Sequence, residues 1–367
     1  MMADDERFMR RALELAVRAR GLTSPNPMVG AVLVRDGAVV AEGFHQRAGA
    51  PHAEVEALAR AGEGARGATL YVTLEPCIHH GRTPPCAPAV IAAGVAHVVA
   101  AVADPNPLVS GRGFAALRDA GIDVTVGPLA TEAAALNRVF MTAIRLRRPH
   151  VTLKVGMTLD GKIADVHGAS RWITGEAARL HAHRMRADSD AIVAGAGTVL
   201  RDNPRLDVRL PEPWPREPYR IVLDSGGRTP VDARMIHAGD PSRAIIAVTA
   251  AVSRERVRAL EEAGATVVEL PARDGGVDVG ALLAYLFARE VRAVLLEGGG
   301  EVHAAFLEAG LVDRVAAFVA PMLLGGREAP TAVGGRGRDL KDAVRLLDTA
   351  VTVVGEDLLV EADVARV

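Results

Sequence analysis

One histidine and two cysteines, His52, Cys77 and Cys86, are the residues best suited to chemistry in this sequence. An imidazole and two thiolates are a ligand set that a catalytic zinc uses, and they leave its fourth position for water. Glu54 follows the histidine by two positions. Zinc lowers the pKa of its water from about 15.7 to about 7, but a leaving amine must still be protonated. We therefore expect hydrolytic zinc chemistry, with Glu54 as the proton carrier.

The order of these residues is more specific than their types. His-x-Glu, followed by Pro-Cys and a second cysteine, is the signature of zinc-dependent nucleobase deaminases. The chain has only two cysteines, and both fall inside this pattern. A closed structural zinc site would need a fourth ligand, which His79 or His80 could supply. That alternative stays open, although deaminase chemistry explains more of the pattern.

Length and composition exclude several classes of protein. The chain has 367 residues, 49% of them hydrophobic and 24% charged, with a formal net charge of −2. Without a basic excess, a nucleic acid is not the expected partner. Every apolar stretch is shorter than the ~18 residues of a membrane span, and the charged N-terminus lacks a signal-peptide core. Two cysteines committed to a metal leave none for disulfides, so we expect a cytoplasmic protein without a membrane partner.

The elements around the zinc motif predict one α/β domain. We expect helices over residues 5–20, 52–62, 85–94, 114–121 and 131–148, and strands over 29–35, 39–43, 69–74, 95–102 and 122–126. Asp36-Gly37 between two apolar runs predicts a hairpin. The motif residues fall at helix starts beside strand ends, where open α/β sheets place their sites. We predict a three-layer domain over residues 1–146.

A second α/β alternation predicts a separate domain over residues 147–367. We expect strands over 150–156, 190–195, 219–223, 244–248, 265–270, 291–296, 314–320 and 351–361, and helices over 175–187, 253–264, 278–289 and 301–309. Continuous apolar runs such as 190–195 are typical of buried parallel strands.

Two glycine clusters in this second half could contact a nucleotide. Gly195-Ala196-Gly197 follows a strand, but Leu200 stands where the Rossmann fingerprint needs a third small residue. Glu297-Gly298-Gly299-Gly300-Glu301 follows a strand and opens a helix, whose free N–H groups can bind an anion. A tight turn that needs glycine for positive φ explains the second cluster equally well.

Together, these motifs resemble the bifunctional deaminase–reductases of riboflavin biosynthesis over essentially the whole chain. In the first half the similar segments are Ser24–Gly30, Gly43–His45, Pro51–Glu54, Thr73–Cys86, Asp104–Pro107 and Gly111–Gly113. Eight residues separate the two cysteines, whereas most nucleoside and tRNA deaminases have a shorter loop there. In the second half, Leu159–Ala164, Trp172–Thr174, Gly197–Leu206 and Glu297–Gly299 resemble NADPH-dependent pyrimidine reductases. The resemblance implies a cytidine-deaminase-like first domain and a dihydrofolate-reductase-like second domain.

The resemblance also implies the two reactions and the residues that serve them. In the first, 2,5-diamino-6-(5-phosphoribosylamino)pyrimidin-4-one is deaminated, with zinc on His52, Cys77 and Cys86, and with Asn26 on the base or sugar. In the second, NADPH reduces the opened ribose to a ribityl chain. The NADPH residues would be Gly156, Trp172, Thr198, Asp202, Ser225, Gly299, Gly300 and Glu301. The substrate residues would be Ser170, Arg186, Leu206, Arg209 and Glu297.

Some of these assignments leave alternatives open. Arg186 and Arg209 suit a phosphate because a guanidinium offers a bidentate fork, but they could instead form structural salt bridges. Lys154 is a further candidate for approaching the substrate, and no acid for ring opening is assigned. Gly300-Glu301 departs from the family, which commonly has proline and then a small residue. A carboxylate is unfavourable beside a pyrophosphate, so Glu301 could instead cap the helix.

Two other functions compete with this interpretation. The first is a nucleoside or tRNA zinc deaminase whose C-terminal domain only binds. The second is a metal-dependent regulatory protein with an inactive site, against which the complete His52, Glu54, Cys77 and Cys86 set argues. We expect a small-molecule substrate and a homo-oligomer.

Overall fold

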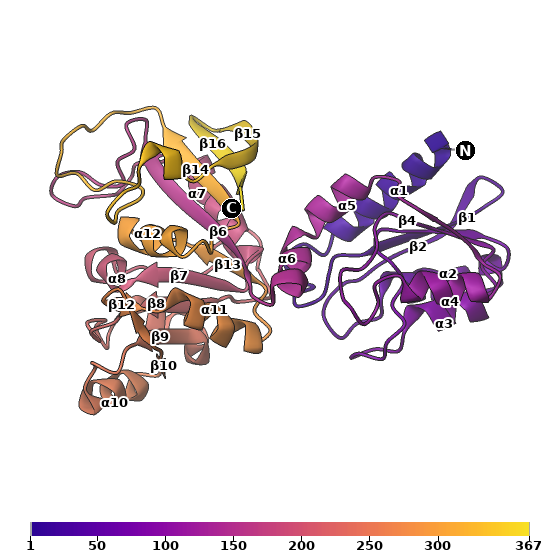
Figure 1. Ribbon diagram of the computed structural model, residues 1–367, viewed down its shortest axis with the longest axis horizontal. Helices are drawn as coiled ribbons and strands as arrows, with labels where there is room; N and C mark the ends of the chain where they lie inside the picture. The colour runs from indigo at the N-terminus through magenta and orange to yellow at the C-terminus, as the bar shows by residue number, and fades with distance from the viewer. Residues whose placement is uncertain (1, 367) are drawn as a thin grey trace. The chain divides into compact units, whose positions relative to one another are not determined.

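The computed structural model describes residues 2–366, with side chains from residue 4 onward. The chain divides into two compact units, Met1–Arg147 and Arg148–Val367 (Figure 1). The sequence places the domain boundary between residues 146 and 147. Among the described residues, no helix combines the length and the apolar character that crossing a membrane requires.

The first unit is built on a five-stranded sheet with strand order β2-β1-β3-β4-β5. Its strands are β1 (Gly30–Arg35), β2 (Ala38–Phe44), β3 (Thr69–Val72), β4 (His97–Ala100) and β5 (Asp123–Val126). β1 is antiparallel to β2 and β3, and β3, β4 and β5 are parallel. The predicted hairpin is confirmed: β1 turns into β2 through Asp36 and Gly37, whose φ angles of 52° and 75° suit a type I′ turn.

Helices cover both faces of this sheet (Figure 1). They are α1 (Met2–Val17), α2 (Ala53–Ala61), α3 (Cys86–Ala92), α4 (Arg112–Asp119), α5 (Ala130–Leu136) and α6 (Arg138–Leu146), with a short 3₁₀ turn at Gly62–Ala65. Successive strand side chains point to opposite faces. Leu33 and Leu70 therefore pack in the core under α2, α3 and α4, whereas Val32 and Tyr71 pack against α1. The predicted three-layer arrangement is confirmed.

The single helix expected over 131–148 is wrong. It is interrupted at Asn137, which separates α5 from α6 and is only 2% exposed. The Asn137 side chain accepts a hydrogen bond from Met28 N–H and donates one to Met28 O, both at 2.8 Å. The interruption thus lets a buried amide hold the segment that carries Asn26.

The second unit contains a nine-stranded sheet with order β10-β9-β8-β7-β13-β6-β14-β16-β15. Its strands are β6 (His150–Thr158), β7 (Ala191–Gly195), β8 (Tyr219–Leu223), β9 (Ala244–Val248), β10 (Thr266–Glu269), β13 (Ala293–Leu296), β14 (Arg314–Ala320), β15 (Leu346–Val354) and β16 (Asp357–Val364). The strands from β10 to β14 are parallel, and β16 and β15 extend the sheet in antiparallel fashion. A separate two-stranded ribbon joins β11 (Ala272–Arg273) and β12 (Gly276–Val277).

Helices again lie on both faces of the sheet, around separate apolar clusters. They are α7 (Glu176–Ala187), α8 (Ala196–Asp202), α9 (Arg234–His237), α10 (Arg254–Glu262), α11 (Val279–Ala288) and α12 (Gly300–Glu308), with 3₁₀ turns at Pro241–Arg243 and Leu340–Asp342. Along β7, Val193 packs with α11 and α12, and its neighbour Ile192 packs with α8, α9 and α10. This layering buries both faces of the parallel strands.

The strand expected over 351–361 is wrong, because this segment turns back on itself. β15 and β16 form a hairpin around Gly355, whose φ of 67° is left-handed. The apolar alternation on either side hides the turn, since both arms have strand-like patterns. The turn brings Asp357 to the start of α7, where its Oδ2 accepts a hydrogen bond from Gly175 N–H at 2.8 Å.

Candidate active sites

The three expected metal ligands come together in the first unit. His52 immediately precedes α2, Cys77 lies in the loop after β3, and Cys86 is the first residue of α3. Their ligand atoms lie within 4.8 Å of one another. His52 Nδ1 is 3.1 Å from Cys86 Sγ and 3.5 Å from Cys77 Sγ. Two helix starts and one loop thus converge on a single point.

Neighbouring groups orient these ligands. His52 Nε2 lies 3.0 Å from Thr83 Oγ1, which fixes the ring with Nδ1 toward the thiols. Cys86 N–H donates to Cys77 Sγ over 3.3 Å. Gly43 of β2 lets α2 approach the sheet, because a β-carbon there would lie 2.4 Å from Ala53 O.

Glu54 lies beside the ligands with only 3% of its surface exposed. Burial, and then the negative charge of Cys77, raises the pKa of Glu54 to about 7. A hydrogen bond from the Cys86 side chain outweighs burial and lowers the pKa of Cys77 to about 4. The site therefore combines a ready thiolate with a carboxyl group that can both accept and release a proton near neutral pH.

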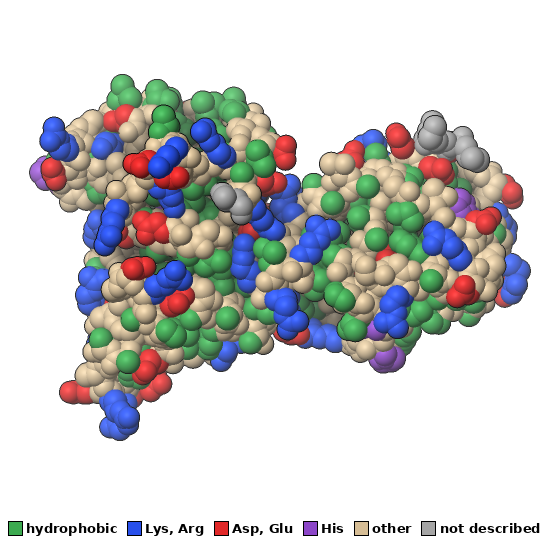
Figure 2. All heavy atoms as spheres, in the orientation of Figure 1, with side chains coloured by type: hydrophobic (Ala, Val, Ile, Leu, Met, Phe, Trp, Pro, Cys, Tyr) green, Lys and Arg blue, Asp and Glu red, His purple; other side chains and the backbone are tan. Residues whose placement is uncertain are grey.

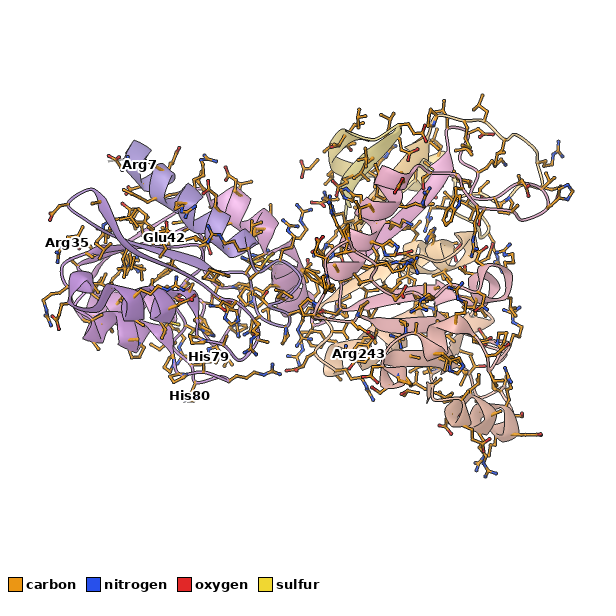
Figure 3. All side chains as sticks on the ribbon, turned by 180° about the vertical axis from the view of Figure 1, so that it is seen from behind. Arg7, Arg35, Glu42, His79, His80 and Arg243 are labelled. Carbon is orange, nitrogen blue, oxygen red and sulfur yellow. The ribbon has the colours of Figure 1, made fainter. Side chains whose placement is uncertain are left out.

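The donor set fits zinc with an open coordination position. One imidazole and two thiols are suitable zinc ligands, and the cluster found among the described residues contains neither His79 nor His80. Both histidines lie on the loop between β3 and α3 at the edge of the unit (Figure 3). His80 Nδ1 instead contacts Gly81 O at 3.2 Å. This arrangement favours a catalytic site over the closed structural site.

His45 is a site residue to which the sequence assigned no role. It is 2% exposed, and its Nδ1 lies 3.0 Å from Pro51 O, an acceptor, so Nδ1 carries the proton. Nε2 can then accept from Asn26 Nδ2 at 3.1 Å. Burial lowers the pKa of His45, in keeping with this neutral form. His45 thereby sets the orientation of the Asn26 amide and turns its donor group toward the ring.

Glu75 is a second residue that local reasoning missed. It is 3% exposed, and its carboxylate accepts four backbone N–H groups, those of Asp104, Gly111, Gly113 and Phe114, over 2.9–3.2 Å. Glu75 precedes Cys77 by two residues. It therefore ties the chain that carries one metal ligand to the loop before α4 and to the first turn of that helix.

The second unit has a cavity of about 160 Å³, which is lined in part by β6, by α8 after β7 and by the turn after β13. It brings together six of the residues expected to bind cofactor or substrate. These are Gly156, Ser170, Thr198, Asp202, Glu297 and Gly299. Lys154 and Arg201 also line it. The segments that follow β7 and β13, namely α8 and the Gly299 turn, thus meet at this cavity, as expected where neighbouring parallel strands end.

The other expected residues lie outside the lining of this cavity. Trp172 is 66% exposed, with the Arg179 guanidinium 4.4 Å from its ring centre. The side chain of Leu206 is 2% exposed and packs in the core, so only its backbone can contact a ligand. Ser225 accepts a hydrogen bond from Thr249 through its carbonyl oxygen.

Arg186 is engaged by protein groups. Its Nε and Nη2 donate to the two Glu297 oxygens at 2.7 and 2.8 Å, and its Nη1 donates to Asp207 O at 2.8 Å. Lys154 Nζ lies 3.8 Å from Glu297 Oε2. Burial raises the pKa of Glu297, but the charges of Arg186 and Lys154 outweigh it and hold the pKa at about 2. The carboxylate at the cavity is therefore ionised and oriented.

The Gly300-Glu301 departure has a steric explanation. A β-carbon at Gly300 would lie 2.8 Å from both Gly334 N and Thr331 O, so this helix start has no room for a side chain. Glu301 is directed at the same loop, where its Oε1 accepts from Gly335 N–H at 3.4 Å. Glu301 is absent from the residues that line the cavity.

Charged side chains of both signs lie on the face of each unit that Figure 2 shows. This distribution agrees with the formal net charge of −2.

Family models match both units. Residues 2–102 match the cytidine and deoxycytidylate deaminase zinc-binding region, and residues 149–360 match the RibD C-terminal domain. Among curated relatives, the riboflavin biosynthesis protein RibD of Actinobacillus pleuropneumoniae is 43% identical over 355 residues, covering 96% of this chain and 94% of the relative. RibD of Escherichia coli K12 is 46% identical over 332 residues, covering 88% and 89%.

Solved structures agree over the whole chain. Acinetobacter baumannii RibD superposes with a TM-score of 0.90 at 38% identity, covering 100% of both chains. A Thermotoga maritima protein superposes with a TM-score of 0.86 at 37% identity, covering 99% of both. That protein is described as a diaminohydroxyphosphoribosylaminopyrimidine deaminase/5-amino-6-(5-phosphoribosylamino)uracil reductase.

Proposed function

Because the chain belongs to the RibD family of bifunctional riboflavin-biosynthesis deaminase–reductases, we propose a substrate and a set of residues for each of its two activities. The RibD C-terminal domain in the second unit rules out a nucleoside or tRNA deaminase with a merely binding partner domain. The first substrate is 2,5-diamino-6-(5-phosphoribosylamino)pyrimidin-4-one. The final product is 5-amino-6-(5-phosphoribitylamino)uracil.

His52, Cys77 and Cys86 hold the zinc of the deaminase unit. A bound zinc supplies Lewis-acid activation of water. Glu54 accepts one proton of the attacking water and delivers it to a ring nitrogen, and it then transfers the second proton of that water to the amine, which departs as ammonia. Asn26, oriented by His45, holds the base or sugar. The observation that carries this assignment is the burial of Glu54 beside three convergent ligands.

NADPH is the hydride donor of the reductase unit. Gly156, Thr198, Asp202 and Gly299 bind it around the cavity. Trp172 and Ser225, which do not line the cavity, are assigned to the cofactor on the family resemblance. At the α12 start, Gly300 and Glu301 contribute backbone N–H groups, since the Glu301 carboxylate faces the 334–335 segment.

The sugar-phosphate substrate occupies the side of the cavity formed by Ser170 and Glu297. Arg209 supplies positive charge for its phosphate, and Leu206 contributes through its backbone. Arg186 acts by holding Glu297, because each of its three guanidinium nitrogens already donates to a protein acceptor.

We also propose that the chain works as a cytoplasmic homo-oligomer, with neither nucleic acid nor membrane as partner. Both cysteines are free thiols. On β15, which ends the nine-stranded sheet, Leu347, Val351 and Val353 are 53%, 61% and 71% exposed. An apolar edge strand of this kind is suited to pairing with a second copy. Light scattering of the purified protein tests the oligomer, and a monomer at micromolar concentration would contradict it.

Two assays test the function as a whole. Purified protein supplied with the diamino substrate should release ammonia, and after deamination it should oxidise NADPH. Ammonia release without NADPH oxidation on the deaminated intermediate would contradict the reductase assignment. NADPH oxidation without ammonia release would contradict the deaminase assignment.

A further inference from the structure

His183 lies on α7 between the two arginines that the sequence associated with phosphate. Its Nδ1 is 3.1 Å from the backbone nitrogen of Arg209, and its Nε2 is 3.2 Å from Arg209 Nη2. Arg186 follows His183 by three residues on the same helix face. Through Arg186, this face is joined to Glu297 at the cavity.

The two contacts determine which nitrogen of His183 carries the proton. A neutral imidazole has one donor nitrogen and one acceptor nitrogen, and a backbone N–H can only donate. Nδ1 must therefore be the acceptor, and Nε2 carries the hydrogen. A guanidinium also only donates. Nε2–H and Arg209 Nη2–H thus face each other as two donors, which is unfavourable. A ligand atom that accepts hydrogen bonds from both would remove this repulsion.

The surroundings keep His183 neutral. Burial, followed by the positive charges of Arg186 and Arg209, lowers the pKa of His183 to about 4, against the opposing effect of Glu297 and Asp207. Asp207 Oδ1 accepts a hydrogen bond from Arg209 Nη1 at 2.7 Å, and Nη1 is the other terminal nitrogen of the guanidinium. The facing pair therefore remains available to a ligand.

We infer that His183 Nε2–H and the Arg209 guanidinium together bind the phosphomonoester of the reductase substrate, which makes His183 a direct phosphate ligand. This inference rests on the proposed reductase function. One phosphate oxygen has lone pairs for both donors, and the charge comes from Arg209. His183 adds a donor of fixed direction, because the Arg209 backbone holds its ring.

The test compares His183→Ala, His183→Gln and His183→Asn on two substrates, 5-amino-6-(5-phosphoribosylamino)uracil and the same compound without its phosphate. His183→Ala should raise KM for the phosphorylated substrate about tenfold with little change in kcat, as expected for a lost donor. KM for the compound without phosphate should not change. The inhibition constant of inorganic phosphate, measured as a competitive inhibitor, should rise by a similar factor.

The two amide variants separate direct binding from positioning. Gln places an N–H donor near the position of Nε2 and should restore most of the KM. Asn places an acceptor near the position of Nδ1, so it can hold the Arg209 backbone but cannot reach the phosphate. Restoration by Asn and not by Gln would overturn the inference, and so would an equal rise in KM for both substrates. If His183→Ala does not fold, the Gln and Asn pair still decides.

Controls distinguish this inference from the proposed function. His237→Ala removes an exposed histidine of the same unit and should leave both KM values unchanged. Wild-type protein that fails to reduce the phosphorylated substrate would refute the proposed function itself. Wild-type reduction together with an unchanged KM in His183→Ala would refute the role of His183 alone. In an Arg209→Ala background, His183→Ala should have a smaller effect, because both donors serve the same phosphate.

Discussion

At the scale of single residues, Glu54 combines the two properties that a proton carrier needs. It is buried beside the metal ligands, and its pKa is raised to about 7 by burial and by the charge of Cys77. A carboxyl group whose pKa lies near the working pH exchanges protons in both directions with little driving force lost. The same burial distinguishes Glu54 from Glu56, whose carboxylate accepts from Phe44 N–H and Arg60.

Replacing Glu54 by glutamine should abolish proton transfer and spare the metal. We expect deamination to fall by about 10²–10⁴-fold, the usual contribution of a general acid–base group. Zinc content, measured by atomic absorption, should stay near one per chain, whereas Cys77→Ser should lose both zinc and ammonia release. Near-wild-type deamination in Glu54→Gln would remove this residue from the mechanism.

Glu297 illustrates the opposite electrostatic situation. Its pKa lies at about 2, below its ordinary value of 4.5, because Arg186 and Lys154 outweigh burial. A carboxyl group whose pKa is lower in the folded state stabilises the fold at pH values above its pKa in the unfolded state. This stabilisation is lost as the pH falls through its pKa in the folded state. The contribution is therefore complete above about pH 5 and disappears toward pH 2.

Glu297→Gln should destabilise the protein in a pH-dependent way. At pH 7 we expect the free energy of unfolding to fall by about 3 kcal/mol. This loss comes from the difference between the folded and unfolded pKa values of Glu297 and from leaving Arg186 without its carboxylate. At pH 3 the loss should be roughly halved, because wild type has then lost part of its advantage. Urea unfolding at both pH values measures this. The exposed Glu269→Gln is the control, and a pH-independent difference for Glu297→Gln would contradict the assignment.

At the scale of elements, both sites lie where a strand ends and a helix begins. His52 and Cys86 stand at the starts of α2 and α3, and Gly299 precedes α12. Helix starts expose N–H groups and the positive end of the helix dipole, which favour thiolates and anions. Parallel strands align these starts at one sheet edge, so each unit gathers residues that are distant in the sequence.

Gly299→Val should raise KM for NADPH by about tenfold or more, since backbone must approach the pyrophosphate there. A β-carbon at Gly299 would meet Arg201 Nη2 and Thr198 Oγ1 at 3.8 Å, which is ordinary contact, so the fold should tolerate this change. A β-carbon at Gly298 would instead lie 2.5 Å from Val302 Cβ, so Gly298→Val should destabilise the protein. Titration of NADPH fluorescence and thermal unfolding separate the two effects. Unchanged NADPH affinity in Gly299→Val would contradict the proposed cofactor site.

At the scale of the whole molecule, the two activities belong to two separate cores. The apolar clusters of Met1–Arg147 share no residue with those of Arg148–Val367. The metal ligands lie in the first unit and the cavity in the second. A division of this kind is typical of domains that can fold independently.

A fragment of residues 148–367 should therefore fold and reduce the deaminated intermediate with NADPH. Its activity should not respond to a zinc chelator, because all three metal ligands lie before residue 148. Circular dichroism and NADPH oxidation check both points. An insoluble fragment would show that the cores depend on each other, and chelator-sensitive reduction would contradict the separation of the two activities.

Short-range sequence determined much of this protein. The spacing of His52, Glu54, Cys77 and Cys86 indicated a zinc deaminase, and the Asp36-Gly37 turn predicted its hairpin correctly. Apolar periodicity was sufficient to predict α/β layers, because it reflects which face of each element is buried. The resemblance carried by longer motifs then identified the family correctly.

Only the tertiary structure decided how buried polar groups are paired. Arg186 donates to Glu297, which is 111 residues away in the sequence. Glu75 accepts from backbone N–H groups at α4, and His183 accepts from the backbone N–H of Arg209. Periodicity also missed the interruption at Asn137 and the turn at Gly355. The reason is that a buried donor or acceptor must be satisfied by whatever group the fold brings beside it. That neighbour is set by strand order and helix contact, which a local pattern does not contain.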